Sequence, residues 1–359
     1  MGAVAAAEAM RRSILMILCG LGALFLVLAL ASVGFYFWAS RGLLAPEALT
    51  QTRHYPAPEV APSPVITVVT WNIGYLSGMT NNLPLRPAAT FYEENARAAV
   101  AMLASLAPDI LALQEIDLGA ARSYDVDQVA LLAEGLGLPH AAVAVNWDKR
   151  YVPFPYWPPK VHFGRMLSGQ AVLSRWPVVS HQRVVLQKPA AAPFYYRAFY
   201  LDRLAQVVIL EDVAATDKQW SRIVVINVHL EAFDRETREA QAKALREIIA
   251  THRDLPLIVL GDFNALPVDA TQVTGFSDEP EADFAGDRTM HLLAEIAGLV
   301  EALPGASGPA SFTFPADVPT RRLDYIFYSP DHFSAVEARV ITAAGVEASD
   351  HLPVMLKLQ

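Results

Sequence analysis

Residues 13–39 form an almost unbroken apolar run without a single charged side chain. An α-helix rises 1.5 Å per residue, so these 27 positions extend over about 40 Å. The hydrocarbon core of a bilayer is only about 30 Å thick, and one helix of this length crosses it. A helix packed in a soluble domain normally keeps a polar face, and this run has none. The sequence therefore predicts one membrane-spanning helix over 13–39.

The basic residues beside the run predict its orientation. Arg11 and Arg12 precede it, and Arg41 follows it. Because basic residues are more frequent on the cytoplasmic side, this bias favours a cytoplasmic N-terminus over 1–12 and an extracytoplasmic location for the rest of the chain. The run ends in four aromatic residues suited to the far membrane interface, Phe35, Tyr36, Phe37 and Trp38.

A cleaved signal peptide is the alternative interpretation, because Ala29, Leu30 and Ala31 resemble a small-x-small cleavage site. The apolar run, however, is about twice the usual 7–15 residues and continues past that site. We therefore expect a single-pass signal anchor. Both interpretations export the remainder of the chain.

Residues 40–64 are expected to form a linker between the membrane and one domain over 65–359. Proline stiffens an extended chain, and it recurs in this stretch as Pro46, Pro56, Pro58, Pro62 and Pro64. The only cysteine is Cys19, which excludes a disulfide framework and a cysteine-based zinc site. The net charge of −9 and the absence of a basic stripe argue weakly against a nucleic-acid partner, and no protein partner is predicted.

The region 65–359 alternates β-rich runs with helical patterns. Strands are expected at 65–70, 110–113, 141–145, 171–173, 178–186, 204–210, 223–228, 257–260, 325–328, 336–342 and 354–358. Helices are expected at 93–106, 126–136, 235–252 and 291–297. Many strands with few helices predict two packed sheets with helices outside, in one domain.

Polar side chains capable of chemistry stand at the ends of these strands. Asn72, Glu115, His229, Asp262 and Asp350 each follow an apolar run, whereas Asp324 directly precedes one. Strand ends are rigid and open onto one face of a fold, so such groups can converge there. Glu115, Asp350 and Asn72 offer the oxygen ligands that Mg²⁺ prefers. Each residue alone has an ordinary structural explanation as a cap, a turn or an ion pair, and only their joint occurrence indicates a site.

In this order the segments resemble the endonuclease/exonuclease/phosphatase superfamily, which includes deoxyribonuclease I, neutral sphingomyelinases and inositol polyphosphate 5-phosphatases. The resemblance covers about 65–359. Seven motifs carry it, namely TWNIG, LALQEID, GQAVLSRWP, INVHLEAF, VLGDFNALP, RRLDYIF and SDHLPV. It implies an α+β fold, a four-layer sandwich of two packed, mainly antiparallel sheets flanked by helices. It also implies a metal-dependent phosphoric ester hydrolase.

The resemblance also implies a role for each site residue. Glu115 would be the principal ligand of Mg²⁺, or of Mn²⁺ as an alternative, with Asn72 and Asp350 nearby. Asp262, helped by Asn264, would orient or deprotonate the attacking water. His351 would contact the scissile phosphate while Asp324 fixes its tautomer. His229 would donate to a non-bridging or leaving oxygen, and together these groups would supply a base and positive charge for hydrolysis.

Two residues refine the resemblance. His229 is shared with the deoxyribonuclease I, sphingomyelinase and 5-phosphatase branches, whereas apurinic endonucleases have no histidine at that step. Gln170 stands where the family often has Asn, which puts a phosphate contact at that point in doubt.

The substrate is predicted from two aromatic clusters, at 147–157 and 194–200. In proline-stiffened loops these rings either dip into a lipid interface or fold over the sheets as core. Together with the anchor they favour a phospholipid or another membrane-near phosphate ester over nucleic acid. An exported nuclease of the deoxyribonuclease I type is the alternative. A non-catalytic binding module on the same fold is the third hypothesis, and the full set of acidic and histidine residues argues against it.

Overall fold

The computed structural model describes residues 2–359 except 59–62, 82, 212–220, 297 and 305–307. Within these residues one sheet has seven strands, in the order β1 (Thr50–His54), β4 (His140–Val152), β5 (Gly164–Ser174), β3 (Ile110–Asp117), β2 (Ile66–Asn72), β13 (Val354–Leu358) and β12 (Ala335–Val340). The other has six, in the order β10 (Val300–Glu301), β11 (Asp324–Tyr328), β9 (Leu257–Asp262), β8 (Arg222–His229), β7 (Leu204–Glu211) and β6 (Val178–Val185).

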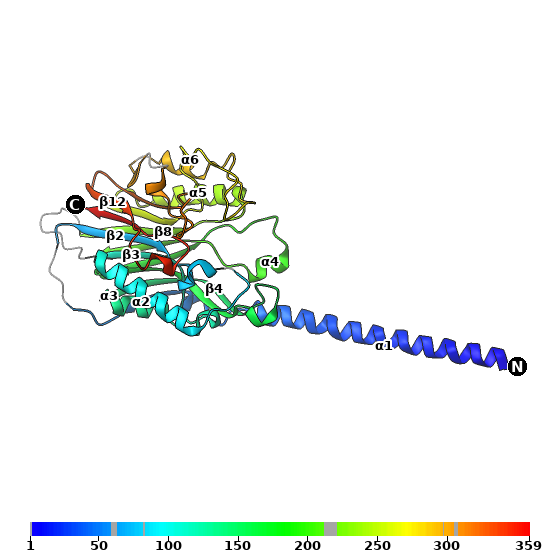
Figure 1. Ribbon diagram of the computed structural model, residues 1–359. Helices are drawn as coiled ribbons and strands as arrows, with labels where there is room; N and C mark the ends of the chain where they lie inside the picture. Colours follow the sequence, from blue (N-terminus) through cyan, green and yellow to red (C-terminus); the bar gives the residue numbers. More distant parts are fainter. Residues whose placement is uncertain (1, 59–62, 82, 212–220, 297, 305–307) are drawn as a thin grey trace.

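Helices cover the outer face of each sheet (Figure 1). The seven-stranded sheet packs against α2 (Ala89–Leu106) and α3 (Gln128–Leu136), and the six-stranded sheet against α5 (Arg235–Ala250) and α6 (Thr289–Ala294). The remaining helices are α1 (Gly2–Ala39) and α4 (Phe194–Phe199). Single 3₁₀ turns are η1 (Pro46–Leu49), η2 (Gly74–Leu76), η3 (Gly78–Thr80), η4 (Ala121–Ser123), η5 (Pro159–Val161), η6 (Pro309–Ser311) and η7 (Val346–Ala348).

The core forms three apolar layers, because both faces of each central strand are covered. In β2, Val69 and Trp71 face the α2 and α3 side, whereas Ile66 and Val68 face the second sheet. This is the period-two alternation of a strand, so a strand buried on both faces is apolar throughout. The predicted four-layer sandwich is thereby confirmed. Both sheets are mixed, since β2 pairs with β3 and β8 with β9 in parallel, and every other pairing is antiparallel.

The stretch 40–64 differs from the predicted linker. Residues 50–54 form β1, which pairs antiparallel with β4 from Thr50 opposite Ala144 to His54 opposite His140. Tyr55 follows in the core beneath α3. The proline content indicated a spacer, but the backbone of residues 50–54 pairs with β4 and extends the sheet at its edge instead. The domain therefore begins close to the end of α1, and residues 59–62 of the expected linker lie outside the described part of the chain.

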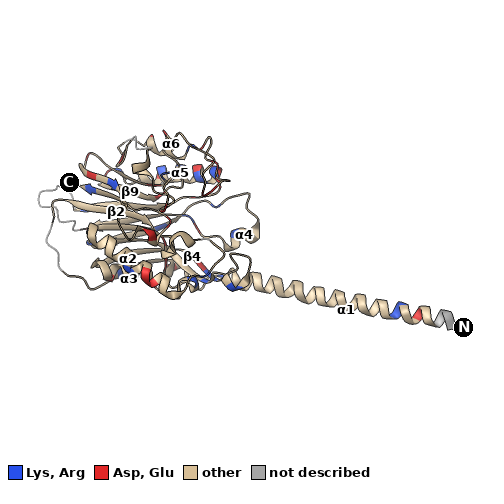
Figure 2. Ribbon diagram, in the orientation of Figure 1, with Lys and Arg blue, Asp and Glu red and all other residues tan. Residues whose placement is uncertain are grey.

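The helix α1 projects from the domain as a rod (Figure 1). From Ala6 to Ala39 it is long and apolar enough to cross a membrane, and its side chains are mostly exposed until the C-terminal end, where Ala39 is buried against the domain. Charged residues lie only near its N-terminal end (Figure 2). It ends at Ala39, the C-terminal boundary predicted for the membrane helix.

Candidate active site

The chemistry-bearing residues meet because the sheet registers bring strand ends together. His229 at the end of β8 stands opposite Asp262 at the end of β9, and Asp262 stands opposite Asp324 at the start of β11. In the other sheet, Asn72 ends β2 beside β3. A bulge in β3 between Leu113 and Ile116 interrupts the pairing, and Glu115 within it has a φ of 51°. This left-handed backbone is costly for a glutamate, by about 1–3 kcal/mol, and such strain is concentrated at functional sites.

Asp262 is held by amide groups from both sheets. The side-chain nitrogen of Asn72 donates to Oδ2 of Asp262 at 3.0 Å, and the backbone N–H of Asn264 donates to Oδ1 at 2.9 Å. The side chain of Asn264 is itself fixed by the carbonyl of Leu230 at 3.0 Å. Burial raises the pKa of Asp262 to about 7, despite the opposing effect of His351. A carboxyl group with this pKa is suited to take a proton near neutral pH.

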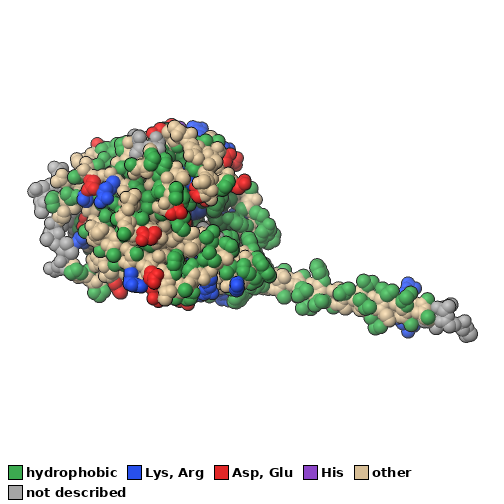
Figure 3. All heavy atoms as spheres, viewed as in Figure 1, with side chains coloured by type: hydrophobic (Ala, Val, Ile, Leu, Met, Phe, Trp, Pro, Cys, Tyr) green, Lys and Arg blue, Asp and Glu red, His purple; other side chains and the backbone are tan. Residues whose placement is uncertain are grey.

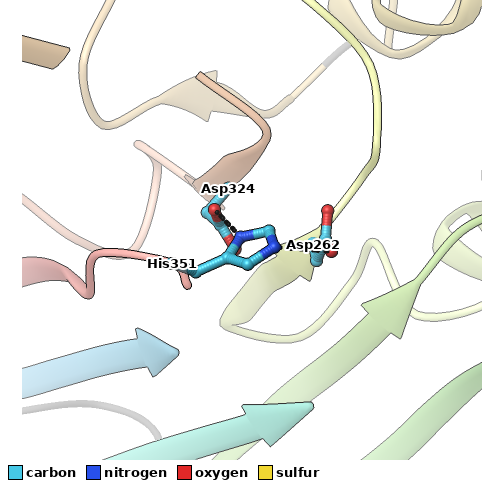
Figure 4. A group of neighbouring side chains, drawn as sticks. All are labelled: Asp262, Asp324 and His351. Carbon is cyan, nitrogen blue, oxygen red and sulfur yellow. Dashed lines mark hydrogen bonds and ion pairs between the residues drawn. The ribbon is translucent and has the colours of Figure 1, made fainter. Parts of the chain in front are cut away.

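His351 and Asp324 form a buried pair beside Asp262 (Figure 4). Nδ1 of His351 donates to Oδ2 of Asp324 at 2.9 Å, and Nε2 lies 3.9 Å from Oδ2 of Asp262. Burial alone would lower the pKa of His351, but the charges of Asp324 and Asp262 outweigh it and raise the pKa to about 10. His351 is therefore an imidazolium whose free edge points toward Asp262.

Glu115 and Asp350 form a second acidic group across the site. The side-chain nitrogen of Asn81 donates to both, at 3.0 Å to Oε2 of Glu115 and 3.2 Å to Oδ2 of Asp350. Burial and the charge of Asp350 both raise the pKa of Glu115. Gly74 permits this approach, since its φ is +48° and a Cβ there would lie 2.5 Å from Oδ1 of Asp350.

This second group fits a hard divalent cation. Two carboxylates that share one amide donor repel each other, and a cation between them would remove that repulsion while using oxygen ligands. Asp262, Asp324 and His351 also offer ligand atoms within 4.8 Å of one another. That cluster already has its own positive charge, because Asp324 and Asp262 raise the pKa of His351 and favour its protonated form. Glu115 and Asp350 are the better candidates.

Asn72 is bonded to Asp262, whereas its predicted role placed it near a metal held mainly by Glu115. Its nitrogen bonds Asp262, and its oxygen accepts from the N–H of Gly74 at 3.1 Å. Gln170, the departure from the family pattern, is fully buried and donates to the carbonyl of Asn227 at 3.2 Å, where it joins the two sheets.

His229 has a neighbour that sequence reasoning missed. Arg203, directly before β7, donates to Nε2 of His229 and lies 3.6 Å from Oε2 of Glu231. His229 also lies 3.5 Å from Oδ2 of Asp262 and 3.8 Å from Oε1 of Glu115. Its Nε2 therefore accepts a hydrogen bond, which differs from the donor role that the resemblance implied.

All eight predicted site residues lie along this edge of the two sheets, linked by the contacts above. Asn81 and Arg203 were missed. Asn81 has no strand before it, so nothing in the sequence marks it. Arg203 is a charged residue directly before an apolar strand, the same arrangement that identified Asp324, and that signal was available.

Comparison with known proteins shows the family of this chain. Residues 69–351 match the model of the Endonuclease/Exonuclease/phosphatase family, and this range spans all eight site residues. The chain belongs to that family and is accordingly a phosphoric ester hydrolase. None of the curated proteins matches it.

Solved structures share the fold at low sequence identity. An endonuclease/exonuclease/phosphatase from Beutenbergia cavernae has 22% identity and a TM-score of 0.59, covering 82% of this chain and 71% of its own. The catalytic domain of human Nocturnin has 19% identity and a TM-score of 0.54, and the match covers 88% of this chain and 99% of that one. A mannosyl-6-phosphatase from Bacteroides thetaiotaomicron has 16% identity and a TM-score of 0.53, and the match covers 82% of this chain and 99% of that one.

Proposed function

We propose that this chain is a Mg²⁺-dependent phosphoesterase, anchored by α1 with its catalytic domain on the extracytoplasmic side, that hydrolyses a phospholipid or another membrane-near phosphate ester. One observation carries the proposal. The acidic pair Glu115–Asp350, the buried base Asp262 and the His351 imidazolium converge at the edge of the sheet from which α1 also leaves the domain.

The groups have complementary tasks in hydrolysis. Asp262, held by Asn72 and Asn264, orients an attacking water and takes its proton. The His351 imidazolium, held by Asp324, donates to a phosphate oxygen and stabilises its developing charge. His229, at the end of β8, lies within 3.8 Å of Glu115 and Asp262, and Arg203, directly before β7, donates to it. A divalent cation held by Glu115 and Asp350 supplies further positive charge for the phosphate when it is bound.

The anchor and the charge balance favour a membrane substrate. A tethered site samples lipid headgroups at a high effective concentration, without diffusion through bulk water. The chain carries a net charge of −9, which is unfavourable for tracking a nucleic-acid backbone. Of the named branches that share His229, those acting on lipid or inositol phosphates therefore fit better than a nuclease.

The test is an assay of the full-length protein in lipid vesicles or detergent, with Mg²⁺ or with EDTA. Substrates are phospholipid vesicles, inositol phosphates and plasmid DNA. Turnover of a lipid or inositol phosphate that EDTA abolishes is expected. Nicking of plasmid with inert lipids would instead support the nuclease, and loss of all turnover would support the binding module.

A further inference from the structure

Two aromatic segments lie beside the base of α1, namely the loop 153–163 between β4 and β5 and the helix α4, and four of their rings face solvent. Tyr156 is 66% exposed, Trp157 77%, Phe194 73% and Tyr195 55%. Their neighbours are core, since Trp147, Phe154 and Phe163 pack together beneath the loops. Burial over the sheets, one of the two predicted fates of the aromatic clusters, thus holds for these inner rings, whereas the four outer rings stay exposed. We call the four exposed rings the aromatic face, and hydrophobic side chains gather beside the base of α1 in Figure 3.

Ring contacts join β4 and α4 to the C-terminal end of α1. Phe35 meets Tyr151 with ring centroids 5.9 Å apart, and Tyr36 meets Phe194 at 5.8 Å. The hydroxyl of Tyr151 in turn bonds Nδ1 of His162 at 2.7 Å, at the far end of the first loop. Phe194 of the aromatic face is therefore in direct contact with the aromatic end of the helix, and Tyr156 is linked to it through His162 and Tyr151.

The chain that leaves α1 is fixed to β4. The backbone N–H groups of Leu43 and Leu44 donate to one carboxylate oxygen of Asp148, at 2.8 and 2.7 Å. The N–H of Arg150 donates to the carbonyl of Arg41 at 3.0 Å. These bonds limit rotation of the domain about the helix end.

The active site lies at the same ends of the strands as the attachment of α1. The strand β4 is antiparallel to β5, which is antiparallel to β3, so β4 runs in the direction of β3 and β2. The C-terminal ends of these strands carry the α1 attachment on β4, Glu115 on β3 and Asn72 on β2. Figure 1 shows the arrowhead of β2 pointing to the side of the domain where α4 and α1 lie.

We propose that the aromatic face docks on the bilayer that holds α1 and turns the active site toward the headgroups of that same bilayer. The occupant is a lipid surface because the rings adjoin a helix with an uncharged apolar span. Trp and Tyr, moreover, are favoured at the depth where such a helix leaves the hydrocarbon. This inference rests on the proposed function and adds the substrate's location, a phosphate ester of a lipid in the membrane of the anchor.

Spin labelling tests the docking without any need for activity. Cys19 is the only cysteine, so C19S permits single labels in the full-length chain. Nitroxides are introduced at W157C and F194C, with V336C as the matched control. Val336 is 56% exposed and lies on β12 near Leu358. Leu358 pairs with the start of β2, so Val336 lies at the opposite ends of the strands from the active site. The protein is reconstituted in vesicles of phosphatidylcholine and phosphatidylglycerol.

Labels at 157 and 194 are expected to be accessible to oxygen and protected from a water-soluble nickel complex. The label at 336 is expected to be accessible to the nickel complex. If the labels at 157 and 194 are as accessible to nickel as the label at 336, the aromatic face does not dock on the bilayer and the inference is wrong.

An activity measurement separates docking from catalysis. The double variant W157D/F194D is expected to lose about tenfold in turnover of vesicle lipid, since about 1.4 kcal/mol of lost docking changes an equilibrium tenfold. It should keep its turnover of soluble bis(p-nitrophenyl) phosphate, and V336D should keep both. Equal turnover of vesicle lipid by the double variant and the wild type would overturn the docking and leave the proposed function standing. Protected labels on a chain that hydrolyses no ester would support docking and overturn the proposed function.

Discussion

Arg203 donates a hydrogen bond to Nε2 of His229, and both side chains are almost fully buried. An arginine keeps its charge at any physiological pH, so the imidazole it bonds must be neutral. Burial and the charge of Arg203 both lower the pKa of His229. The fixed positive charge on this side of the site therefore belongs to Arg203, and His229 lies between it and Asp262.

Replacing Arg203 should reduce catalysis. We expect R203Q to lower kcat by about 10²–10³-fold, the usual cost of losing one donor that stabilises developing charge. R203K keeps the charge and should lose less. The measurement is kcat on a soluble diester, with thermal unfolding as a check, because Glu231 loses its buried ionic neighbour. Unchanged kcat in a folded R203Q protein would exclude a role for Arg203 in the reaction.

Asp262 and His351 should be indispensable. D262A and H351A are each expected to lower kcat by about 10²–10⁴-fold, the range typical of a missing general acid or base. Both variants should remain folded, since the sandwich core does not depend on these polar groups. D331N, at an exposed surface position, is the control for D262A and should retain full activity. Near-wild-type turnover in either site variant would show that the site is assigned incorrectly.

Metal dependence should follow Glu115. We expect E115Q to raise the Mg²⁺ concentration for half-maximal activity at least about tenfold, because a neutral amide replaces one of two carboxylates. Calorimetric titration of Mg²⁺ provides a readout independent of turnover. E134Q changes an exposed glutamate of α3 and should leave both curves unchanged. An E115Q titration that overlays the wild type would exclude Glu115 as the main ligand.

Acid should destabilise the fold through His181. Burial lowers the pKa of His181 to about 4, and its Nε2 accepts from the amide of Gln206 at 3.0 Å. The unfolded chain takes up this proton at about pH 6.5, before the folded one does. The free energy of unfolding is therefore not reduced by His181 above about pH 6.5. It falls by up to about 3 kcal/mol through this group as the pH drops to about 4.

Thermal unfolding of the full-length protein at pH 7.5 and pH 5 measures this effect. H181Q should unfold at more similar temperatures in the two buffers than the wild type. H291Q, at an exposed position, should retain the wild-type difference. A wild-type-sized difference in H181Q would assign the acid sensitivity to other groups.

The sequence predicted the central strands because burial on both faces makes them apolar throughout. The strands β2, β8 and β9 were predicted to within two residues at each end. It missed β1 because an edge strand needs no apolar pattern, and residues 50–54 contain none. It missed α4 because six aromatic-rich residues fall short of two turns.

The candidate site was predictable where side chains terminate strands. Asp262 and Asp324 lie on paired strands at adjacent ends, so position along the strand alone brings them together. Asn81 was not predictable, because it follows two 3₁₀ turns whose path depends on packing against α2. Nor did the sequence indicate that Nε2 of His229 would accept, since this depends on a guanidinium from another strand.

The carboxylate of Asp148, which holds the backbone of Leu43 and Leu44, fixes the height of the domain above any membrane that α1 crosses. A flexible tether would let the active site move through a large volume of solution above the membrane. These hydrogen bonds instead keep it within a thin layer parallel to the membrane. Turnover would then follow the number of substrate molecules per unit area rather than per unit volume. Diluting a lipid substrate within the plane of the vesicle should slow the enzyme, and diluting the vesicles themselves should not.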